Sequence, residues 1–179
     1  MPLYEVSHAT PLSQGQRDQL AESITAIHST KFTVPRMFIN VVFTDSSNTP
    51  TYVGGKQVRP HSSRKSNRIV GRVRRGSSRT QEDFSSLCYE IRAAWAQIVH
   101  PETADEGGKL PPQDLELRSV FITGELIAGL KASFPTPLAG DELAWAEENY
   151  AAFKERAEAG DEDFADLVAE IQSWPEFEC

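Results

Sequence analysis

The sequence predicts an α+β fold in which a β-α-β unit occurs twice in tandem and a helical extension follows. Two segments, residues 2–45 and 67–124, each show a strand pattern, an amphipathic helix pattern and a second strand pattern. Residues 141–179 show helical periodicity alone. We therefore expect a double β-α-β domain over residues 1–140 and an acidic helical extension over residues 141–179.

The first unit begins with a strand at Leu3–His8. Ser13 and Gln16 have the spacing of a capping box, and apolar residues then recur at helical spacing over residues 12–30. Met37–Asp45 is rich in aromatic and β-branched residues, which favours a second strand. The intervening helix is long enough for a crossover, so the two strands should be parallel.

The second unit repeats this layout without obvious sequence identity to the first. Arg68–Arg74 is predicted to be a strand, Ser78–Val99 a helix and Glu116–Thr123 another strand. Thr51–Val53 is a candidate short strand between the units, and Pro101–Pro112 reads as an exposed acidic loop. The four main strands should form one mixed sheet with both helices on one face.

The second face of this sheet is also expected to need a cover. Ile39, Val41 and Phe43 alternate with Phe38 and Val42 along the second strand, so both of its faces carry apolar side chains. Oligomerisation is the simplest way to bury the face that the helices leave open.

Charge is distributed unevenly along the chain. Residues 1–100 hold 13 Lys and Arg against 7 Asp and Glu, a net charge of +6, whereas residues 101–179 hold 5 against 19, a net charge of −14. The strongly acidic second part argues against a nucleic-acid partner. No apolar run is long enough to span a membrane, and we see no secretory signal. Cys88 and Cys179 are too few and too far apart for a disulfide framework or a zinc site, so a cytoplasmic protein is expected.

Pro2 is the first candidate functional residue. Methionine aminopeptidases remove an initiator methionine that precedes a small residue such as proline, and the product would carry a secondary amine at its first atom. That amine can act as a general base, a general acid or a nucleophile. A proline at the start of a strand also has an ordinary structural explanation, because its missing N–H costs nothing there.

Arginines gather between the two units and at the start of the second helix. They include Arg72 and Arg74 on one predicted strand face, and Arg75 and Arg79 around the turn into the helix. Two arginines beside a helix N-terminus make an anion site, because the guanidinium fork matches a carboxylate. Arg59, Arg64 and Lys65 more simply belong to a solvated surface.

His28 lies near the end of the first helix, where a histidine either caps the helix dipole or serves a site. The chain has no G-x-S-x-G motif, no glycine-rich phosphate loop and no Cys/His metal spacing, so we expect no cofactor and no metal.

Together these features resemble the tautomerase superfamily, and most of all the group of cis-3-chloroacrylic acid dehalogenase and its fungal relatives. The resemblance covers roughly residues 2–140 and rests on PLYEV, on SITAIH ending at His28, on TYVGG, on the arginine-rich strand and turn, and on SVFITGEL. It implies that Pro2 is the catalytic proline, that His28 serves the site, and that Arg75 and Arg79 bind a substrate carboxylate, with Arg74 as the alternative to Arg75. Fused-repeat members also imply a homotrimer.

Two family residues are absent from their expected positions. The tyrosine of the last strand is replaced by Ile122, or by Phe121 with a shift, and the glutamate that follows falls near Ser133. These two residues are implicated in activating water, so hydrolytic dehalogenation is not expected to be the main activity. Phe121 and Ile122, with Arg72 and Arg74, are instead expected to contact the substrate.

The resemblance therefore implies a cofactor-independent tautomerase that acts on a small 2-oxo or enol carboxylic acid. Decarboxylation, hydration or weak cis-3-haloacrylate dehalogenation at the same site remain alternatives. So do a specialised isomerase of a larger metabolite and a non-catalytic oligomeric binding protein.

Overall fold

The computed structural model describes residues 1–58, 66–104, 112–124 and 129–177. The elements follow one another as β1 (Leu3–His8), α1 (Gln14–Phe32), a 3₁₀ turn η1 (Arg36–Phe38), β2 (Asn40–Asp45), β3 (Thr51–Val53), β4 (Lys56–Val58), β5 (Asn67–Arg72), α2 (Gln81–Val99), α3 (Pro101–Ala104), β6 (Leu117–Thr123), β7 (Leu130–Lys131), β8 (Phe134–Pro135), α4 (Glu142–Glu158) and α5 (Glu162–Gln172). The basic residues Arg59, Arg64 and Lys65 and most of the expected acidic loop lie outside the described residues.

The main sheet has four strands in the order β2-β1-β5-β6. β1 and β2 are parallel, β5 and β6 are parallel, and β1 and β5 are antiparallel. Each parallel pair is joined by one long helix, so the predicted tandem of β-α-β units and the mixed sheet are confirmed. The antiparallel β1–β5 ladder is the seam between the two units.

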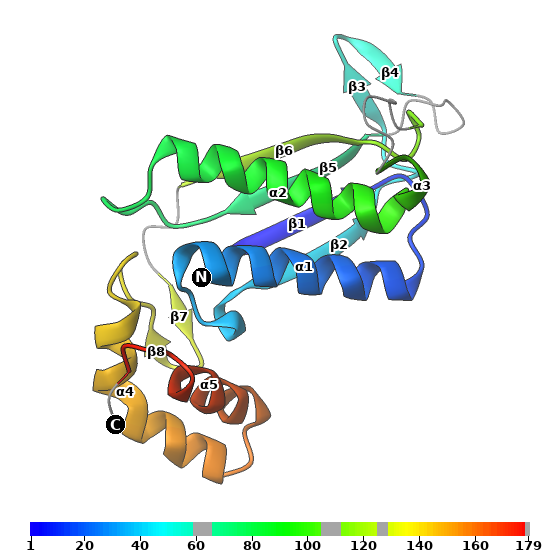
Figure 1. The fold of residues 1–179 in the computed structure, drawn as a ribbon. Helices are drawn as coiled ribbons and strands as arrows, with labels where there is room; N and C mark the ends of the chain where they lie inside the picture. The colour runs from blue at the N-terminus through cyan, green and yellow to red at the C-terminus, as the bar shows by residue number, and fades with distance from the viewer. Residues whose placement is uncertain (59–65, 105–111, 125–128, 178–179) are drawn as a thin grey trace.

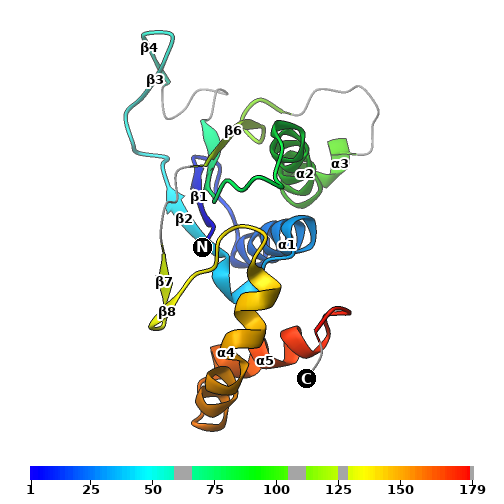
Figure 2. The same ribbon diagram turned by 90° about the vertical axis from the view of Figure 1, so that its left-hand side faces the viewer.

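Both long helices cover the same face of this sheet, as predicted (Figures 1 and 2). Alternate residues of β1 and β5, among them Tyr4, Val6 and Ile69, point toward the helices and are fully buried. Leu20 and Ile24 of α1, and Leu87, Ile91 and Trp95 of α2, complete this core. A core of this kind explains the 3.6-residue spacing of the apolar residues in each helix.

Element ends differ from the predictions by a few residues in several places, and Pro101–Ala104, expected to be loop, is the short helix α3. Three differences have a clear structural reason. Arg36–Phe38 is a 3₁₀ turn, closed by the Phe38 and Ile39 N–H groups donating to the Pro35 and Arg36 carbonyls, and the strand begins only at Asn40. α2 begins at Gln81 because Thr80 forms a capping box with Asp83. β5 ends at Arg72, so Arg74 is not on the strand face where the pattern placed it, and it is buried instead.

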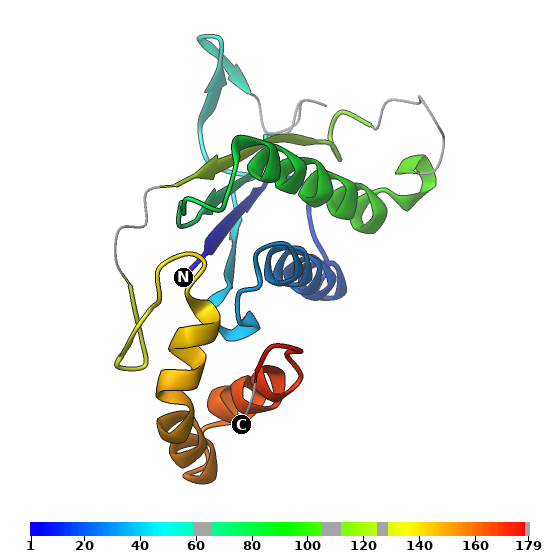
Figure 3. The ribbon, with the colours of Figure 1, turned by 60° about the vertical axis from the view of Figure 1, so that its left-hand side comes forward.

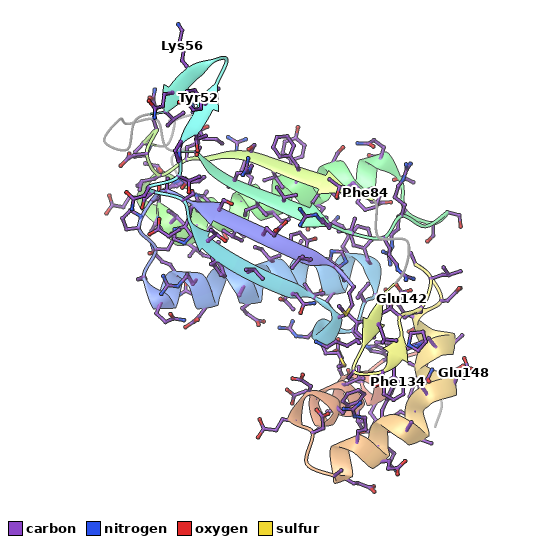
Figure 4. The ribbon with its side chains drawn as sticks, turned by 180° about the vertical axis from the view of Figure 1, so that it is seen from behind. Tyr52, Lys56, Phe84, Phe134, Glu142 and Glu148 are labelled. Atoms are coloured by element: carbon purple, nitrogen blue, oxygen red, sulfur yellow. The ribbon has the colours of Figure 1, made fainter. Side chains whose placement is uncertain are left out.

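Within the described residues no helix covers the opposite face of the sheet, and Figure 4 views the molecule from this side. Val42 is 49% exposed and Phe121 is 54% exposed there. Arg72 pairs with Glu5 on the same face, where both side chains are largely in solvent. Exposed apolar side chains are therefore present on this face, but Glu5 lies in the row between Val42 and Phe121. Phe38, which the sequence pattern placed on the same face as Val42, is instead buried in the 3₁₀ turn.

The β3–β4 hairpin projects away from the sheet (Figure 1). Its turn consists of Gly54 and Gly55, both with positive φ, a conformation that glycine adopts without a steric penalty. Tyr52 and Val53 are more than 60% exposed on this projection. The candidate short strand at Thr51–Val53 is thus confirmed as one arm of a hairpin.

The C-terminal extension is helical, as predicted, and forms its own apolar cluster around Phe153, Phe164 and Ile171. α4 starts close to the N-terminus of the chain and leads away from the sheet (Figure 3). Trp145 of α4 packs edge-on against Phe38, with ring centroids 5.0 Å apart. The extension is therefore tied to the first β-α-β unit. No helix within the described ranges is both long and apolar enough to cross a membrane.

Candidate active site

Pro2 lies at the entrance to β1, at the end of the sheet where α1 finishes and α2 begins. It is buried, and its carbonyl accepts a hydrogen bond from the Asn40 N–H at 3.0 Å. Met1 is half-buried and lines the same small cavity as Pro2, with a volume of about 20 Å³. A space of this size holds about one water molecule while Met1 is in place.

Arg74 forms part of this cavity. The chain turns directly after β5, which brings the Arg74 side chain to the amino terminus and buries it. Its Nη1 donates to the carbonyls of Thr136 and Pro137. Its Nε–H is buried and has no hydrogen-bond partner. An unsatisfied buried guanidinium donor is costly, and it marks a place where a ligand oxygen would bind.

Arg79 lies opposite Arg74 in the same cavity. Its Nη2 donates to Glu142 Oε1 at 2.8 Å, and the two side chains are only 6% and 9% exposed. Its Nη1 donates to the Arg74 carbonyl at 3.3 Å, and its guanidinium lies over the Phe32 ring, 4.8 Å from the centroid. These contacts fix the position and the plane of the guanidinium fork.

Glu142 is the first residue of α4, and the sequence analysis did not single it out. Its Oε2 accepts a hydrogen bond from the Gly140 N–H at 2.6 Å, while Oε1 holds Arg79. The only sequence signal for it is its position at the start of the extension, just after Gly140 and Asp141. Its contact with a residue more than 60 positions away depends on tertiary structure.

His28 is fully buried one layer beneath this cavity. Its Nδ1 lies 2.7 Å from the Tyr4 hydroxyl and shares a hydrogen bond with it. Its ring is 4.9 Å from the Phe32 ring, which in turn supports Arg79. Burial, with the Arg79 charge, lowers the pKa of His28 to about 3, so the imidazole is neutral near pH 7.

A larger cavity of about 490 Å³ lies on the other side of Arg79, between the start of α2 and the end of β6. Arg75, Phe121 and Ile122 line it, together with Phe84 and Cys88 of α2. The stem of Arg75 runs across Gly124, where an added Cβ would lie 2.1 Å from the Arg75 Cγ. Among the described residues the Arg75 guanidinium has no ion-pair partner.

The predicted site residues thus fall into two groups that meet at Arg79. Pro2, Arg74 and Arg79 line the small cavity, and His28 lies beneath it. Arg75, Phe121 and Ile122 line the large cavity. Arg72 joins neither, because its side chain pairs with Glu5 on the helix-free face.

The electric field at the amino terminus favours a neutral amine. Burial, with the charges of Arg74 and Arg79, lowers the pKa of the Met1 amino group from 8.0 to about 6, while Glu142 acts in the opposite direction. The site therefore combines an uncharged basic nitrogen with two guanidinium groups. In the part of the chain that the structure describes, His, Cys, Asp and Glu side chains form no cluster that could hold a metal ion.

Solved structures with the same fold are known, and the sequence matches a protein family. The structure is similar to N1, a member of the cis-3-chloroacrylic acid dehalogenase family, with a TM-score of 0.56 and 19% identity over 92% of this chain and 99% of that chain. It is also similar to RhCC from Rhodococcus jostii RHA1, with a TM-score of 0.51 and 21% identity over 82% of this chain and 96% of that one. A fused 4-OT gives a TM-score of 0.50 and 17% identity over 68% and 84% of the two chains.

No curated protein matches the sequence. Residues 1–150, however, match the sequence family Tautomerase_3, whose description reads "Putative oxalocrotonate tautomerase enzyme". That span includes both β-α-β units, Pro2, the arginines and Glu142. The chain therefore belongs to the Tautomerase_3 family.

Proposed function

We propose that the protein is a cofactor-independent cytoplasmic tautomerase that uses the amino group of Pro2, after removal of Met1, on a small enol or 2-oxo carboxylic acid. The observation that carries the proposal is the placement of Pro2 in one cavity with the side chains of Arg74 and Arg79. Family membership and the dehalogenase and 4-OT neighbours support it at the level of the superfamily.

The proline nitrogen would act as a proton carrier. Burial and the charges of Arg74 and Arg79, which lower the pKa of the Met1 amino group, would also act on the Pro2 nitrogen once Met1 is removed, and they favour its neutral form. It would take the hydroxyl proton of an enol and return a proton to the adjacent carbon, which yields the 2-oxo acid. No atom is gained or lost in this step.

The arginines would hold the substrate carboxylate and stabilise negative charge on the enolate oxygen. Arg74 would pair with Arg79 in this role, because both line the cavity that holds Pro2 and the Nε–H of Arg74 has no partner there. Arg75 and Ile122 would contact the remainder of the substrate in the larger cavity, whereas Phe121 borders this cavity from the edge strand and presents its side chain to the helix-free face. Neutral His28 would support Arg79 through Phe32.

Removal of Met1 would also provide the space that a substrate needs, because the methionine is one of the residues that enclose the small cavity. The proposal includes a homotrimer, supported by the helix-free sheet face with its exposed Val42 and Phe121. No role for nucleic acid or membrane is included.

The test begins with the intact mass of the purified protein, which must lack Met1. Phenylenolpyruvate ketonisation is then compared between the wild type and Pro2→Ala, with Pro50→Ala in an exposed loop as the matched control. We expect Pro2→Ala to lower kcat/KM by about a hundredfold or more and Pro50→Ala to leave it unchanged. A 3-halopropiolate should add one covalent label, at Pro2.

Retention of Met1, or an unchanged rate in Pro2→Ala, would refute the mechanism. Failure of the wild type to turn over any enol acid, together with absence of labelling, would favour the non-catalytic binding protein instead.

Hydration at the same site is a second candidate, and Glu142 is the observation that favours it. The sequence lacks the family glutamate near Ser133, yet the structure brings a buried carboxylate to Pro2 from α4. A carboxylate there could take a proton from a water whose oxygen adds to one carbon of the substrate double bond, while the protonated form of Pro2 delivers a proton to the other carbon. Chloride release from cis-3-chloroacrylate that disappears in Glu142→Gln would support this activity, and absence of chloride release in the wild type would exclude it.

A further inference from the structure

Glu142 belongs to the extension, but its side chain lies in the cavity of the double β-α-β domain. Figure 4 shows Glu142 at the end of α4 nearest the sheet, whereas Glu148 lies farther along the same helix. The backbone just before Glu142 packs against the segment that follows β5. Arg74 donates to the Pro137 carbonyl, and an added Cβ on Gly76 would lie 2.7 Å from the Ala139 Cβ.

This arrangement places a carboxylate of the protein on the arginine that a substrate carboxylate would use. Nη1 of Arg79 is bonded to the Arg74 carbonyl, Nη2 is bonded to Glu142, and one face of the guanidinium is covered by Phe32. A ligand carboxylate that approaches Arg79 must therefore share the guanidinium with Glu142, and it competes with Glu142 for Nη2. Buried charge-assisted pairs are strong enough to make this competition costly for the ligand.

Arg74, the other cation that lines the cavity, uses only part of its hydrogen-bonding capacity. Arg74 uses Nη1 for two carbonyls and leaves its Nε–H without a partner. A ligand oxygen could thus bind Arg74 first, with Glu142 still on Arg79. Engagement of both arginines would then bring the ligand into competition with the carboxylate at the start of α4.

We propose that Glu142 is a positioning residue that competes with the ligand carboxylate for Arg79, so that the C-terminal extension sets how strongly the Pro2 site binds carboxylic acids. The proposal rests on the proposed function for the identity of the site and extends it to a residue outside the two β-α-β units. The ligand class is a monocarboxylate, because Glu142 cancels one of the two positive charges.

The same residue also acts on the charge of the amino terminus, where burial is the largest influence. The charged groups that face the amino terminus are Arg74 after β5, Arg79 before α2 and Glu142 of α4, while His28 of α1 is neutral. The two arginines lower the pKa of the amino group and Glu142 raises it. Loss of the Glu142 charge should therefore make the amine lose its proton at lower pH.

The experiment compares wild type, Glu142→Gln and Glu148→Gln, the last of which removes the same charge from an exposed position on the same helix. Dissociation constants are measured by NMR titration for phenylacetate and for its uncharged analogue phenylacetamide. We expect Glu142→Gln to bind phenylacetate about tenfold more tightly and to bind phenylacetamide unchanged. Glu148→Gln should behave as wild type for both ligands.

Unchanged or weaker phenylacetate binding in Glu142→Gln would overturn the proposal. Equal tightening in Glu148→Gln would also overturn it, because the effect would then be one of net charge. Because binding is measured without turnover, these outcomes are separate from the ketonisation test of the proposed function, and they can be repeated in the Pro2→Ala background. A general loss of structure could weaken binding but would not tighten it for the anion alone.

A second variant covers the case in which Glu142→Gln does not fold. Glu142→Asp keeps the charge but shortens the side chain, which lengthens its distance to Arg79, and it should bind phenylacetate more tightly than wild type. For active protein, the rising limb of the pH–rate profile of Glu142→Gln should move to lower pH relative to wild type. A shift to higher pH would contradict the assigned charge effect.

Discussion

β1 and β5 are neighbours at the centre of the sheet, and each begins one of the two β-α-β units. Ahead of β1, Pro2 lies in a cavity beside Arg74, whose Nε–H has no partner. At the start of β5, Asn67 is fully buried, and its amide makes five hydrogen bonds, to Ala9, Thr10, Asp114 and Glu116. The starts of the two strands are thus used differently. Beside Pro2 a buried guanidinium donor has no partner, whereas the side-chain amide of Asn67 is fully hydrogen-bonded.

The difference indicates how a repeated unit can hold a reactive site without losing its fold. The Asn67 amide ties the turn after β1 to the segment before β6, so the second unit stabilises the end of the sheet that lies far from Pro2. Unsatisfied donors at the other end can then be tolerated. This division predicts that substitutions at the two positions affect different properties.

The largest stability effect is expected at Asn67. Asn67→Ala leaves the Ala9 and Thr10 N–H groups and the Glu116 carbonyl without their side-chain partner, while the Asp114 carbonyl keeps the Thr10 hydroxyl. The free energy of unfolding should therefore fall by about 3 kcal/mol. Pro2→Ala should change it by less than about 0.5 kcal/mol while activity falls. Urea unfolding measures both, with exposed Asn48→Ala as the control. A stable Asn67→Ala protein would show that the contrast between the two strand entrances is false.

The next largest effect is the pH dependence of stability that comes from His28, which is buried with Tyr4 in the first unit. The pKa of His28 is about 3 in the folded protein and near 6.5 when unfolded, so the unfolded chain binds more protons between these values. Stability is therefore lost as pH falls below about 6.5, by up to about 1.4 kcal/mol per pH unit from this residue.

This acid sensitivity is tested by the change in unfolding free energy between pH 7 and pH 5. The wild type should lose about 2 kcal/mol more than His28→Gln, in which no imidazole can be protonated. Equal losses in the two proteins would show that His28 is not held neutral by burial.

A smaller effect is expected where the two units meet. A Cβ on Gly71 of β5 would lie 2.7 Å from the Tyr4 ring and 2.8 Å from the Ile122 Cδ1, so Gly71→Ala should destabilise the protein by about 1–2 kcal/mol. Gly15 in α1 has no atom within 4 Å of an added Cβ, and Gly15→Ala should be neutral or slightly stabilising. Thermal unfolding should therefore give a clearly lower Tm for Gly71→Ala and an unchanged or slightly higher Tm for Gly15→Ala.

The smallest effect is expected for Arg72. Its pair with Glu5 is solvent-exposed, and Arg72→Gln should change stability by less than about 1 kcal/mol. Because its side chain lies on the helix-free face, ketonisation should change by less than about twofold, whereas Arg74→Gln should lower kcat/KM strongly. A large loss of activity in Arg72→Gln would place the substrate on the other face of the sheet.

Much of the fold could be predicted from the sequence because each unit follows simple local patterns. The β-branched run after Asn40 and the 3.6-residue spacing in α1 and α2 both reflect burial against one core. Strand ends were less predictable. Phe38 looks like a strand residue, but it packs against Trp145, more than 100 positions away, and the chain forms a 3₁₀ turn there.

The candidate site could be predicted in outline and not in detail. Residue type and spacing single out Pro2, His28 and the arginines, since these depend on local sequence. The choice between Arg74 and Arg75 depends on which way the chain turns after β5, and the structure places Arg74 beside Pro2 and Arg75 beside Gly124. Glu142 was missed because the first residue of a distant helix gives no sign of its tertiary partner.

The antiparallel ladder between β1 and β5 has a consequence for how the halves of the chain depend on each other. Residues 46–66 are the covalent link between the two units. The β1–β5 ladder and the packing of α1 on α2, which hold the units together, involve none of these residues. A cut at the Gly54–Gly55 turn would leave two peptides whose association the link had assisted only through a high effective concentration, on the order of millimolar. Compared with free halves at about 1 μM each, the covalent link is then worth about 4 kcal/mol, and the two cut halves should co-purify as a heterodimer.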